Sequence, residues 1–356
     1  MAPVLRSQVG GKDNPAFRKL TPASLIHPHR ETFEHALHRV LATDAAELTF
    51  AQIADGLPIS AVARDSYSQP LWHRHPLHEL HREVCVGAVS KAKEFRETLD
   101  LNILEFNSPL VHGFTGAAPG SRVFQALLVE MVARSLRQLG TKLHQLGVDA
   151  GSHANDGLAS WIPLEEDVVW WCEHPDGQPP PTLFRHEWYC DYDQYPNGIS
   201  DGVGFWAEAR ILGGVMLFDR RDPKQNPHAD PSAIYIHADQ ADVTYRICKL
   251  TDVQRQALLD FLTSKDVKSE IPLPIVPNFD NRVRVDPEEP LSETGIYRDL
   301  WERRTFGPKD YDYRLRDVND SLNWVTDEDW YDARKRAFRR KWAWQREMDE
   351  QESESD

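Results

Sequence analysis

Four histidines and a cysteine crowd one short stretch of this chain and could bind a transition metal. The stretch, residues 72–85, reads WHRHPLHELHREVC. On a helix, His78, His81 and Cys85 are spaced three and four residues apart and share one face, which is ligand spacing for zinc or copper. A solvated helix face is the commoner explanation, because a metal site normally takes a further ligand from a second element. We therefore keep His78, His81 and Cys85 as candidate metal ligands.

Charged residues also lie inside the most apolar part of the chain, residues 202–222, which reads GVGFWAEARILGGVMLFDRRD. If this segment is a strand, Glu208 and Arg210 point to the same face, because the side-chain period of a strand is two. Charges within an apolar segment must be paired or functional. An internal salt bridge is the commoner case, and a pocket lined by Trp206 and these two charges is the alternative.

His237 and Asp239 form a His-x-Asp pair at the end of a predicted strand. Non-haem iron oxygenases present two of their three metal ligands in this way. Their third ligand is a downstream histidine, and no histidine follows His237 in the chain, so that ligand order is excluded. A hydrogen bond at the strand end is the commoner role for His237. If a polar active site exists, Glu208, Arg210, His237 and Asp239 are its candidate catalytic residues.

Composition and missing motifs exclude several classes of protein. A formal charge of −15 opposes binding to nucleic-acid phosphate. The four cysteines include no CxxC pair, which is typical of a reducing compartment. The start of the chain lacks a signal-peptide pattern, and the longest apolar run, residues 211–218, is too short to span a bilayer. We expect a cytoplasmic protein that binds neither membrane nor nucleic acid. No cofactor is identified, because residues 113–121 lack the Lys-Ser/Thr ending of a nucleotide-binding loop.

Helical spacing of apolar residues dominates the first half of the chain, over residues 29–41, 76–99 and 121–146. Short segments rich in β-formers follow, at residues 182–189, 203–212, 215–218, 233–237 and 243–250. A helix over residues 205–212 is the alternative for one of them, because Ala, Glu and Arg favour helix. Thr251 and Gln254 then form a capping box for a further helix. The pattern predicts an α+β fold, with a helical N-terminal half packed on an antiparallel sheet and a helical C-terminal tail.

The same pattern divides the chain into regions. We expect an extended arm over residues 1–28, then a mainly helical region over 29–150 that forms one compact domain with the sheet and its following helix over 151–264. A proline-rich irregular segment with a short helix covers 265–325, and an amphipathic helix with an acidic tail covers 326–356. Seven basic residues lie between Arg334 and Arg346, interleaved with Trp and Phe. The acidic tail largely cancels their field, so docking on the protein body, or on a protein partner through residues 326–350, is favoured.

Five segments resemble an uncharacterised family of filamentous-fungal (ascomycete) proteins: GFWAEARILGGVMLFDRRD, AIYIHADQADVTYRICKL, IPLPI, RVRVDPEEP and IYRDLWERR. The likeness covers about residues 158–304. It implies an intracellular fungal protein that serves specialised metabolism, and it carries over no catalytic residue, because the family has no established activity. We expect a small-molecule-handling protein, a tailoring or accessory factor, with a pocket between the 203–239 sheet and the 121–146 helix. The alternative is a non-catalytic protein-protein interaction factor that acts through the C-terminal helix, and whether the protein is an enzyme is left open.

Overall fold

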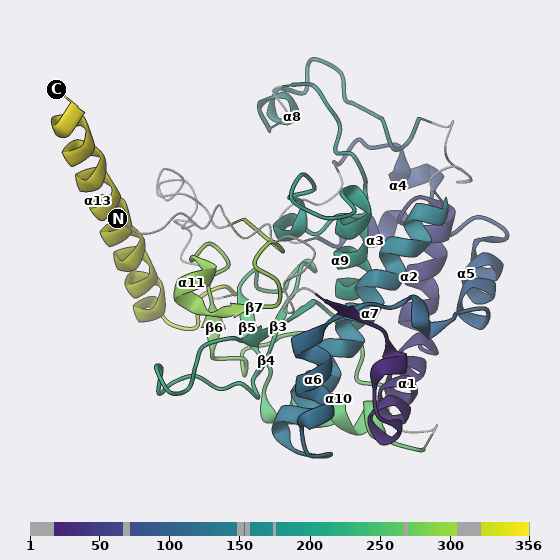
Figure 1. Cartoon of the computed structure of the whole chain (residues 1–356). Helices are drawn as coiled ribbons and strands as arrows, with labels where there is room; N and C mark the ends of the chain where they lie inside the picture. The colour runs from purple at the N-terminus through teal and green to yellow at the C-terminus, as the bar shows by residue number, and fades with distance from the viewer. Residues whose placement is uncertain are drawn as a thin grey trace.

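A layer of helices from the first half of the chain packs against a five-stranded antiparallel sheet (Figure 1). The computed structural model describes residues 18–66, 72–147, 153, 157–173, 176–266, 270–304 and 322–355. The helices of the first half are α1 (His27–Leu41), α2 (Asp44–Asp55), α3 (Ser60–Arg64), α4 (Leu77–Leu80), α5 (Ala88–Glu97), α6 (Ser108–Gly116) and α7 (Arg122–Gly147). The predicted α+β class and the helices at 29–41 and 121–146 are confirmed.

The second half of the chain supplies the sheet and further helices. The helices are α8 (Val168–Glu173), α9 (Ile199–Leu212), α10 (Asp252–Thr263), α11 (Leu291–Thr294) and α13 (Asp327–Ser355). The strands are β3 (Val215–Asp219), β4 (Ile234–His237), β5 (Ile247–Lys249), β6 (Arg284–Val285) and β7 (Ile296–Tyr297), in the spatial order β6-β5-β4-β3-β7. A separate two-stranded ladder joins β1 (Lys19–Leu20) to β2 (Phe106–Asn107).

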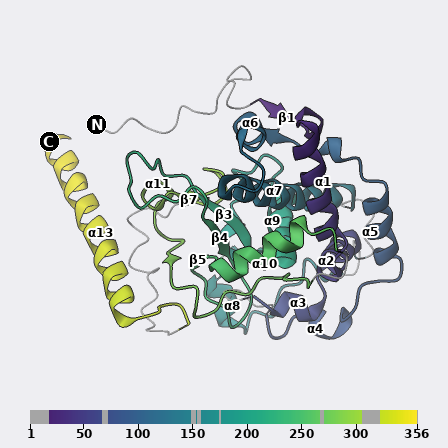
Figure 2. The ribbon, with the colours of Figure 1, turned by 90° about the horizontal axis from the view of Figure 1, so that it is seen from below.

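Both faces of the five-stranded sheet are buried. Along β3, Met216 and Phe218 belong to the large core shared with the helices, whereas Val215 and Leu217 belong to a second core with Tyr189, Phe205 and Tyr245. This alternation follows from the two-residue period of a strand. The helix α10 begins with the predicted capping box, in which Thr251 and Gln254 bond each other's backbone, and it packs against α1 (Figure 2).

The segment 203–212 lies in a helix, α9, so the prediction of a strand there is wrong and the alternative, a helix over 205–212, is confirmed. It lies against α7, and the contact is close because both helices carry a glycine at the crossing. A Cβ on Gly204 would lie 2.4 Å from the carbonyl oxygen of Arg137, and one on Gly140 would lie 2.8 Å from the Cβ of Ala207. The helix ends at Gly213, whose φ of +99° is left-handed, and Gly213 and Gly214 join α9 to β3.

Two further predictions are wrong. The single helix expected over 76–99 is broken into α4 and α5, which are separated by a turn whose Gly87 has a φ of +98°. The chain leaves α4 at His81, because the carbonyl oxygen of His81 turns away to accept the amide of Ser60 at 2.8 Å. Residues 182–189 form no strand: they are irregular and end in a 3₁₀ turn at Glu187–Tyr189. Partners outside each segment decided both outcomes.

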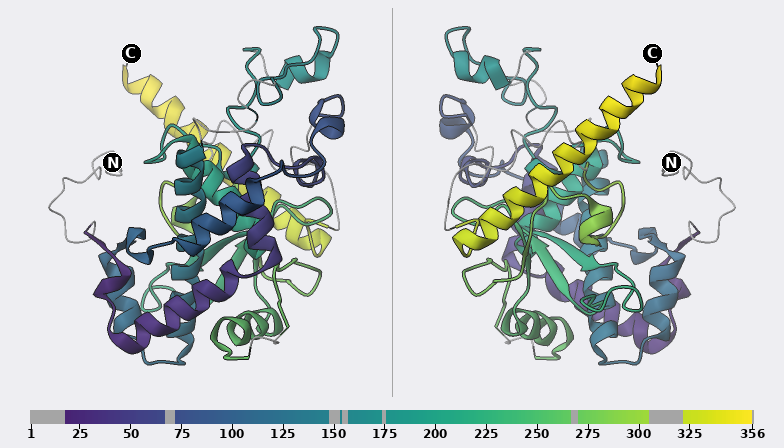
Figure 3. Two further views of the ribbon diagram at one scale, coloured as in Figure 1. Left: turned by 90° about the vertical axis from the view of Figure 1, so that its right-hand side faces the viewer. Right: turned by 90° about the vertical axis from the view of Figure 1, so that its left-hand side faces the viewer.

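The C-terminal helix α13 crosses the outer side of the body, and its last turns project beyond it (Figure 3). Arg336 pairs with Glu289 at 3.0 Å, Arg340 pairs with Glu293, and Ala333 is buried. Among the described helices, none is both long and apolar enough to cross a bilayer. The first 17 residues of the predicted arm, and residues 305–321 of the predicted irregular segment, lie outside the described residues.

Candidate functional site

A pocket of about 1440 Å³ lies between α3, the turn around α4, the 159–185 segment and one face of α9. Trp206 and Arg210 reach it from the same face of α9, because they are four residues apart on a helix. The chain segments that close it come from four distant parts of the sequence. Its main lining residues are Ser66, Trp72, His75, Trp161, Trp170, Arg185, Cys190, Trp206, Arg210 and Asp239.

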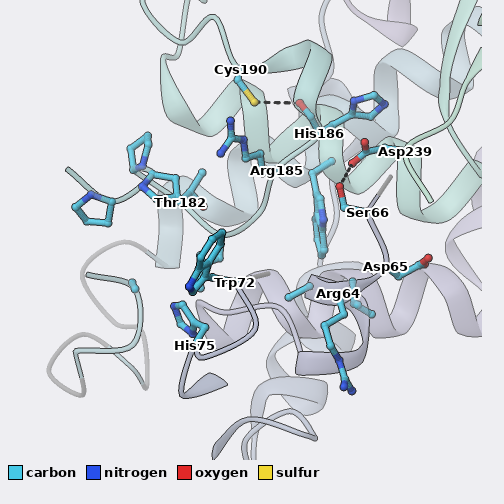
Figure 4. Close-up of a pocket in the computed structure, with 18 of the residues that line it drawn as sticks. Arg64, Asp65, Ser66, Trp72, His75, Thr182, Arg185, His186, Cys190 and Asp239 are labelled. Atoms are coloured by element: carbon cyan, nitrogen blue, oxygen red, sulfur yellow. Dashed lines mark hydrogen bonds between the residues drawn. The ribbon is translucent and has the colours of Figure 1, made fainter. Parts of the chain in front are cut away.

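One wall of the pocket is aromatic. The rings of His75 and Trp161 meet edge to face with centroids 4.9 Å apart, and the indole N–H of Trp72 donates to Asp167 at 2.8 Å. Burial, with the nearby charge of His78, lowers the pKa of His75 to about 4. The amide of Leu77 donates to Nδ1 of His75 at 3.1 Å, which requires that nitrogen to be unprotonated. His75 is therefore a neutral ring at neutral pH, and Figure 4 shows it beside Trp72.

A carboxyl group lies on the opposite side of the pocket. The hydroxyl of Ser66 donates to Asp239 at 3.1 Å, as Figure 4 shows. Burial, and then the neighbouring charge of Glu187, raise the pKa of Asp239 well above its ordinary value. A carboxyl held neutral in this way can donate a hydrogen bond as well as accept one. Arg210, by contrast, is already paired with Asp65 at 2.8 Å.

Arg185 supplies positive charge to the pocket. Its side chain is half-buried and, among the described residues, its guanidinium forms no ion pair and its Nε no hydrogen bond. Figure 4 shows the guanidinium beside Cys190. Cys190 donates its S–H to the carbonyl oxygen of His186 at 3.0 Å, and burial raises the pKa of this thiol, so it is not a thiolate. A half-buried arginine without a carboxylate partner is suited to bind an anionic ligand.

The structure separates the four predicted catalytic residues. Arg210 and Asp239 line the pocket, whereas Glu208 and His237 are fully buried elsewhere. Glu208 lies 200° from Arg210 around a helix, so the two point to opposite sides rather than to one face. Glu208 accepts from Nη1 of Arg298 and from the amide of Met216, each at 2.8 Å.

His237 is equally enclosed. Its Nδ1 lies 3.1 Å from the hydroxyl of Tyr189, and its Nε2 lies 3.0 Å from the carbonyl oxygen of Tyr245. Burial, with His186 and Arg303 nearby, lowers the pKa of His237 well below its ordinary value. A neutral histidine with both ring nitrogens hydrogen-bonded inside the core stabilises the fold. This agrees with the hydrogen-bonding role at the strand end that the sequence favoured for His237.

The three predicted metal ligands also divide. His78 lines the pocket, and its Nε2 bonds the carbonyl oxygen of Trp72 at 2.8 Å. His81 and Cys85 follow the end of α4 and lie close to Asp55 and His153. Neither Asp55 nor His153 was singled out by spacing, because each lies far from residues 72–85 in the sequence.

Sequence reasoning missed most of the pocket wall, notably Trp72, Trp161 and Arg185. One signal pointed to it: five tryptophans gather within residues 161–206, and three of them line the pocket. Comparisons with protein families, with curated proteins and with solved structures each found no match for this chain.

Proposed function

We propose that this protein binds a small organic molecule in the pocket between α3 and α9. The observation that carries the proposal is a cavity of about 1440 Å³ with tryptophan walls and a few polar groups aimed inward. Ligand sites are concave, mostly apolar and carry a small number of placed polar groups, with volumes of roughly 300–1,000 Å³. A cavity of this size accepts a ligand of several fused rings.

The lining also suggests the chemical class of the ligand. Trp72 and the neutral His75 offer faces on which a planar ring stacks. Arg185 offers a charge for a carboxylate or sulfonate, and Asp239, when protonated, offers a hydrogen bond to a carbonyl or hydroxyl group. We propose a polycyclic aromatic acid as the preferred class.

Binding, rather than catalysis, is the role that these groups support best. His75 is held neutral, Cys190 is held as a thiol, and the pKa of Asp239 is raised. The Asp65 carboxylate, which also lines the cavity, is paired with Arg210 at 2.8 Å, so none of these four groups is an activated nucleophile. The proposal is therefore an accessory or carrier protein. Fungal origin, a role in specialised metabolism and a cytoplasmic location remain predictions from the sequence.

The fluorescent dye 1-anilinonaphthalene-8-sulfonate is a suitable probe, because it is a planar aromatic anion. We expect the full chain to bind it at one site, and Arg185→Gln to weaken binding about tenfold, as loss of a charge-assisted hydrogen bond of about 1.5 kcal/mol requires. Arg282→Gln is the matched control, since this arginine is exposed and does not belong to the lining of the cavity. Trp72→Ala should also weaken binding. Equal affinities for the wild type, Arg185→Gln and Trp72→Ala would place the dye elsewhere and refute the proposal.

A second candidate function rests on α13. Trp342 is 66% exposed and Phe338 is 45% exposed on this helix, among basic side chains. Large exposed aromatic residues next to arginine are typical of protein interfaces. The test compares the full chain with one ending at residue 326 and with Trp342→Ala. If α13 is the functional part, both changes abolish capture of a partner while dye binding in the pocket is kept; unchanged capture refutes this candidate.

A further inference from the structure

Four metal-ligating side chains converge at a point outside the pocket. They are Asp55, His81, Cys85 and His153, and one ligand atom from each lies within 4.8 Å of all the others. Asp55 is the last residue of α2, His81 and Cys85 belong to the turn after α4, and His153 follows α7. Three separate segments of the chain thus meet here.

The distances fit a tetrahedral ion. Sγ of Cys85 lies 3.2 Å from Nε2 of His153, which lies 3.7 Å from Oδ1 of Asp55. Nε2 of His81 lies 3.6 Å from Oδ2 of Asp55. Zinc binds nitrogen and oxygen at about 2.0–2.2 Å and sulfur at about 2.3 Å, so the edges of a zinc tetrahedron are roughly 3.3–3.8 Å. The two nitrogen–oxygen distances have that length and the sulfur–nitrogen distance is slightly shorter, while every pair of the four ligand atoms lies within 4.8 Å.

The same contacts argue against a Cys-His-Asp catalytic triad. In a triad, the nucleophile faces one ring nitrogen of the histidine and the acid bonds the other. Here the Cys85 sulfur and the Asp55 carboxylate both approach Nε2 of His153. Nε2 of His81 approaches the same carboxylate. Ligand atoms that converge on one point are the arrangement of a metal site.

Burial and charge also call for a cation. Asp55 is 0% exposed and lies at the C-terminal end of α2, where the helix dipole disfavours an anion. Its Oδ2 accepts the amide of Cys85 at 2.6 Å, but its Oδ1 accepts no hydrogen bond from any described residue. A buried carboxylate requires a charged partner or a metal. A divalent ion together with this carboxylate and a thiolate makes a neutral site.

We propose that Asp55, His81, Cys85 and His153 bind one zinc ion in a closed tetrahedral site. Mixed nitrogen, sulfur and oxygen donors suit zinc, and four protein ligands leave no position for a substrate, so the ion is structural. Nε2 of His81 gives up its contact with the Leu57 carbonyl oxygen, at 3.3 Å, when it binds the metal. The thiol proton of Cys85 is released to solvent.

The position of His81 connects this site to the pocket. Its carbonyl oxygen accepts a hydrogen bond from the amide of Ser60 at 2.8 Å. Ser60 is the first residue of α3, and α3 forms one wall of the pocket. The turn that contains His81 follows α4, which begins at Leu77, two residues after His75. A zinc ion at the cluster thus anchors the wall that carries Trp72 and His75 to the end of α2.

The test measures the metal itself and needs no pocket ligand. Full-length protein is purified without chelator, and its metal content is measured by inductively coupled plasma mass spectrometry. We expect about one zinc per chain, and a fall of at least about tenfold in His153→Ala and Cys85→Ala. His78→Ala is the matched control, because this histidine lies on α4 outside the cluster, and its zinc content should equal that of the wild type. His153 is 14% exposed, so His153→Ala is the variant that keeps its fold most easily, which circular dichroism checks.

Cobalt substitution supplies a second readout. Co(II) in the site should give the visible absorption of a tetrahedral ion together with a thiolate-to-cobalt charge-transfer band, and Cys85→Ala should lose that band while His78→Ala keeps it. Two results would overturn the proposal. One is a metal-free protein that takes up neither zinc nor cobalt on titration. The other is a bound metal whose content is unchanged in both His153→Ala and Cys85→Ala.

Discussion

Replacing Glu208 by alanine tests whether this carboxylate holds the fold together or serves the pocket. The side chains of Glu208 and Arg298 are both 0% exposed, and both carboxylate oxygens lie 2.8 Å from Nη1 of the arginine. Burial disfavours the charge of the guanidinium, but the Glu208 carboxylate raises the pKa of Arg298 above its ordinary value. The alanine variant leaves that cation buried without this partner.

The expected decrease in the free energy of unfolding of Glu208→Ala has two sources. Removing one partner of a buried ion pair costs about 3–5 kcal/mol. The amide of Met216 also loses its acceptor, and an unsatisfied buried donor costs about 1–3 kcal/mol. Asp299 lies 3.9 Å from Nε of Arg298 and compensates part of the charge. We therefore expect Glu208→Ala to lower the free energy of unfolding by about 4 kcal/mol, which is a large part of the roughly 5–15 kcal/mol of a typical domain.

Urea unfolding followed by tryptophan fluorescence measures this loss. The double variant Glu208→Leu with Arg298→Met is the control, because replacing both charges by apolar groups is often neutral or stabilising. It should recover most of the loss and bind the naphthalene dye as the wild type does. If Glu208→Ala unfolds within about 1 kcal/mol of the wild type yet loses dye binding, the carboxylate serves the pocket and the reasoning is refuted.

Three further predictions concern packing, pH and capping. Gly204→Ala forces α7 and α9 apart and should lower the free energy of unfolding by about 1–3 kcal/mol, measured by thermal melts. Gly116→Ala is the control, because no heavy atom lies within 4 Å of its new Cβ, and it should not change stability measurably. Equal losses in the two variants would show that the contact between the helices is not tight. Burial lowers the pKa of His186 from 6.5 to about 4, so the unfolded chain takes up the proton first, and the contribution of His186 to stability should fall by about 2 kcal/mol between pH 7 and pH 5. In urea titrations at the two pH values, His186→Asn should reduce the pH dependence by that amount, while His75 and His237, whose pKa values are also lowered, keep their own contributions. A slope unchanged by His186→Asn would refute the assignment. Thr251→Ala removes the N-cap of α10 and should lower the free energy of unfolding by about 1 kcal/mol. Thr263→Ala, at the other end of this helix, is the control and should not cause the same loss.

The candidate site was predictable only in fragments. Arg210 was singled out as a charge in an apolar segment and Asp239 as part of a His-x-Asp pair, and both line the pocket. Arg185 was not, because an arginine at the end of an irregular segment carries no local pattern. Arg185 is a candidate ligand-binding residue because, among the described residues, no carboxylate pairs with its guanidinium.

The metal ligands illustrate the same limit. Helical spacing grouped His78 with His81 and Cys85, but the helix ends at Leu80, so His78 lines the pocket while His81 and Cys85 meet in the cluster. Asp55 and His153, which replace His78 in the cluster, come from other segments. Spacing can identify ligands that share one element, and it says nothing about a ligand that a distant segment brings to them.

The sequence by itself determined the elements whose causes are local. The capping box at Thr251, the apolar stripe of α7, the three central strands and the α+β class follow from caps, periodicity and turn residues that act within a few positions. Tertiary structure decided the rest. It made residues 203–212 a helix because the glycines of α7 and α9 let the two approach closely, and it ended α4 where His81 bonds Ser60. Tertiary structure also determines the pocket and the metal cluster. Each site is formed by side chains from distant segments, and which side chains come together depends on how the segments pack.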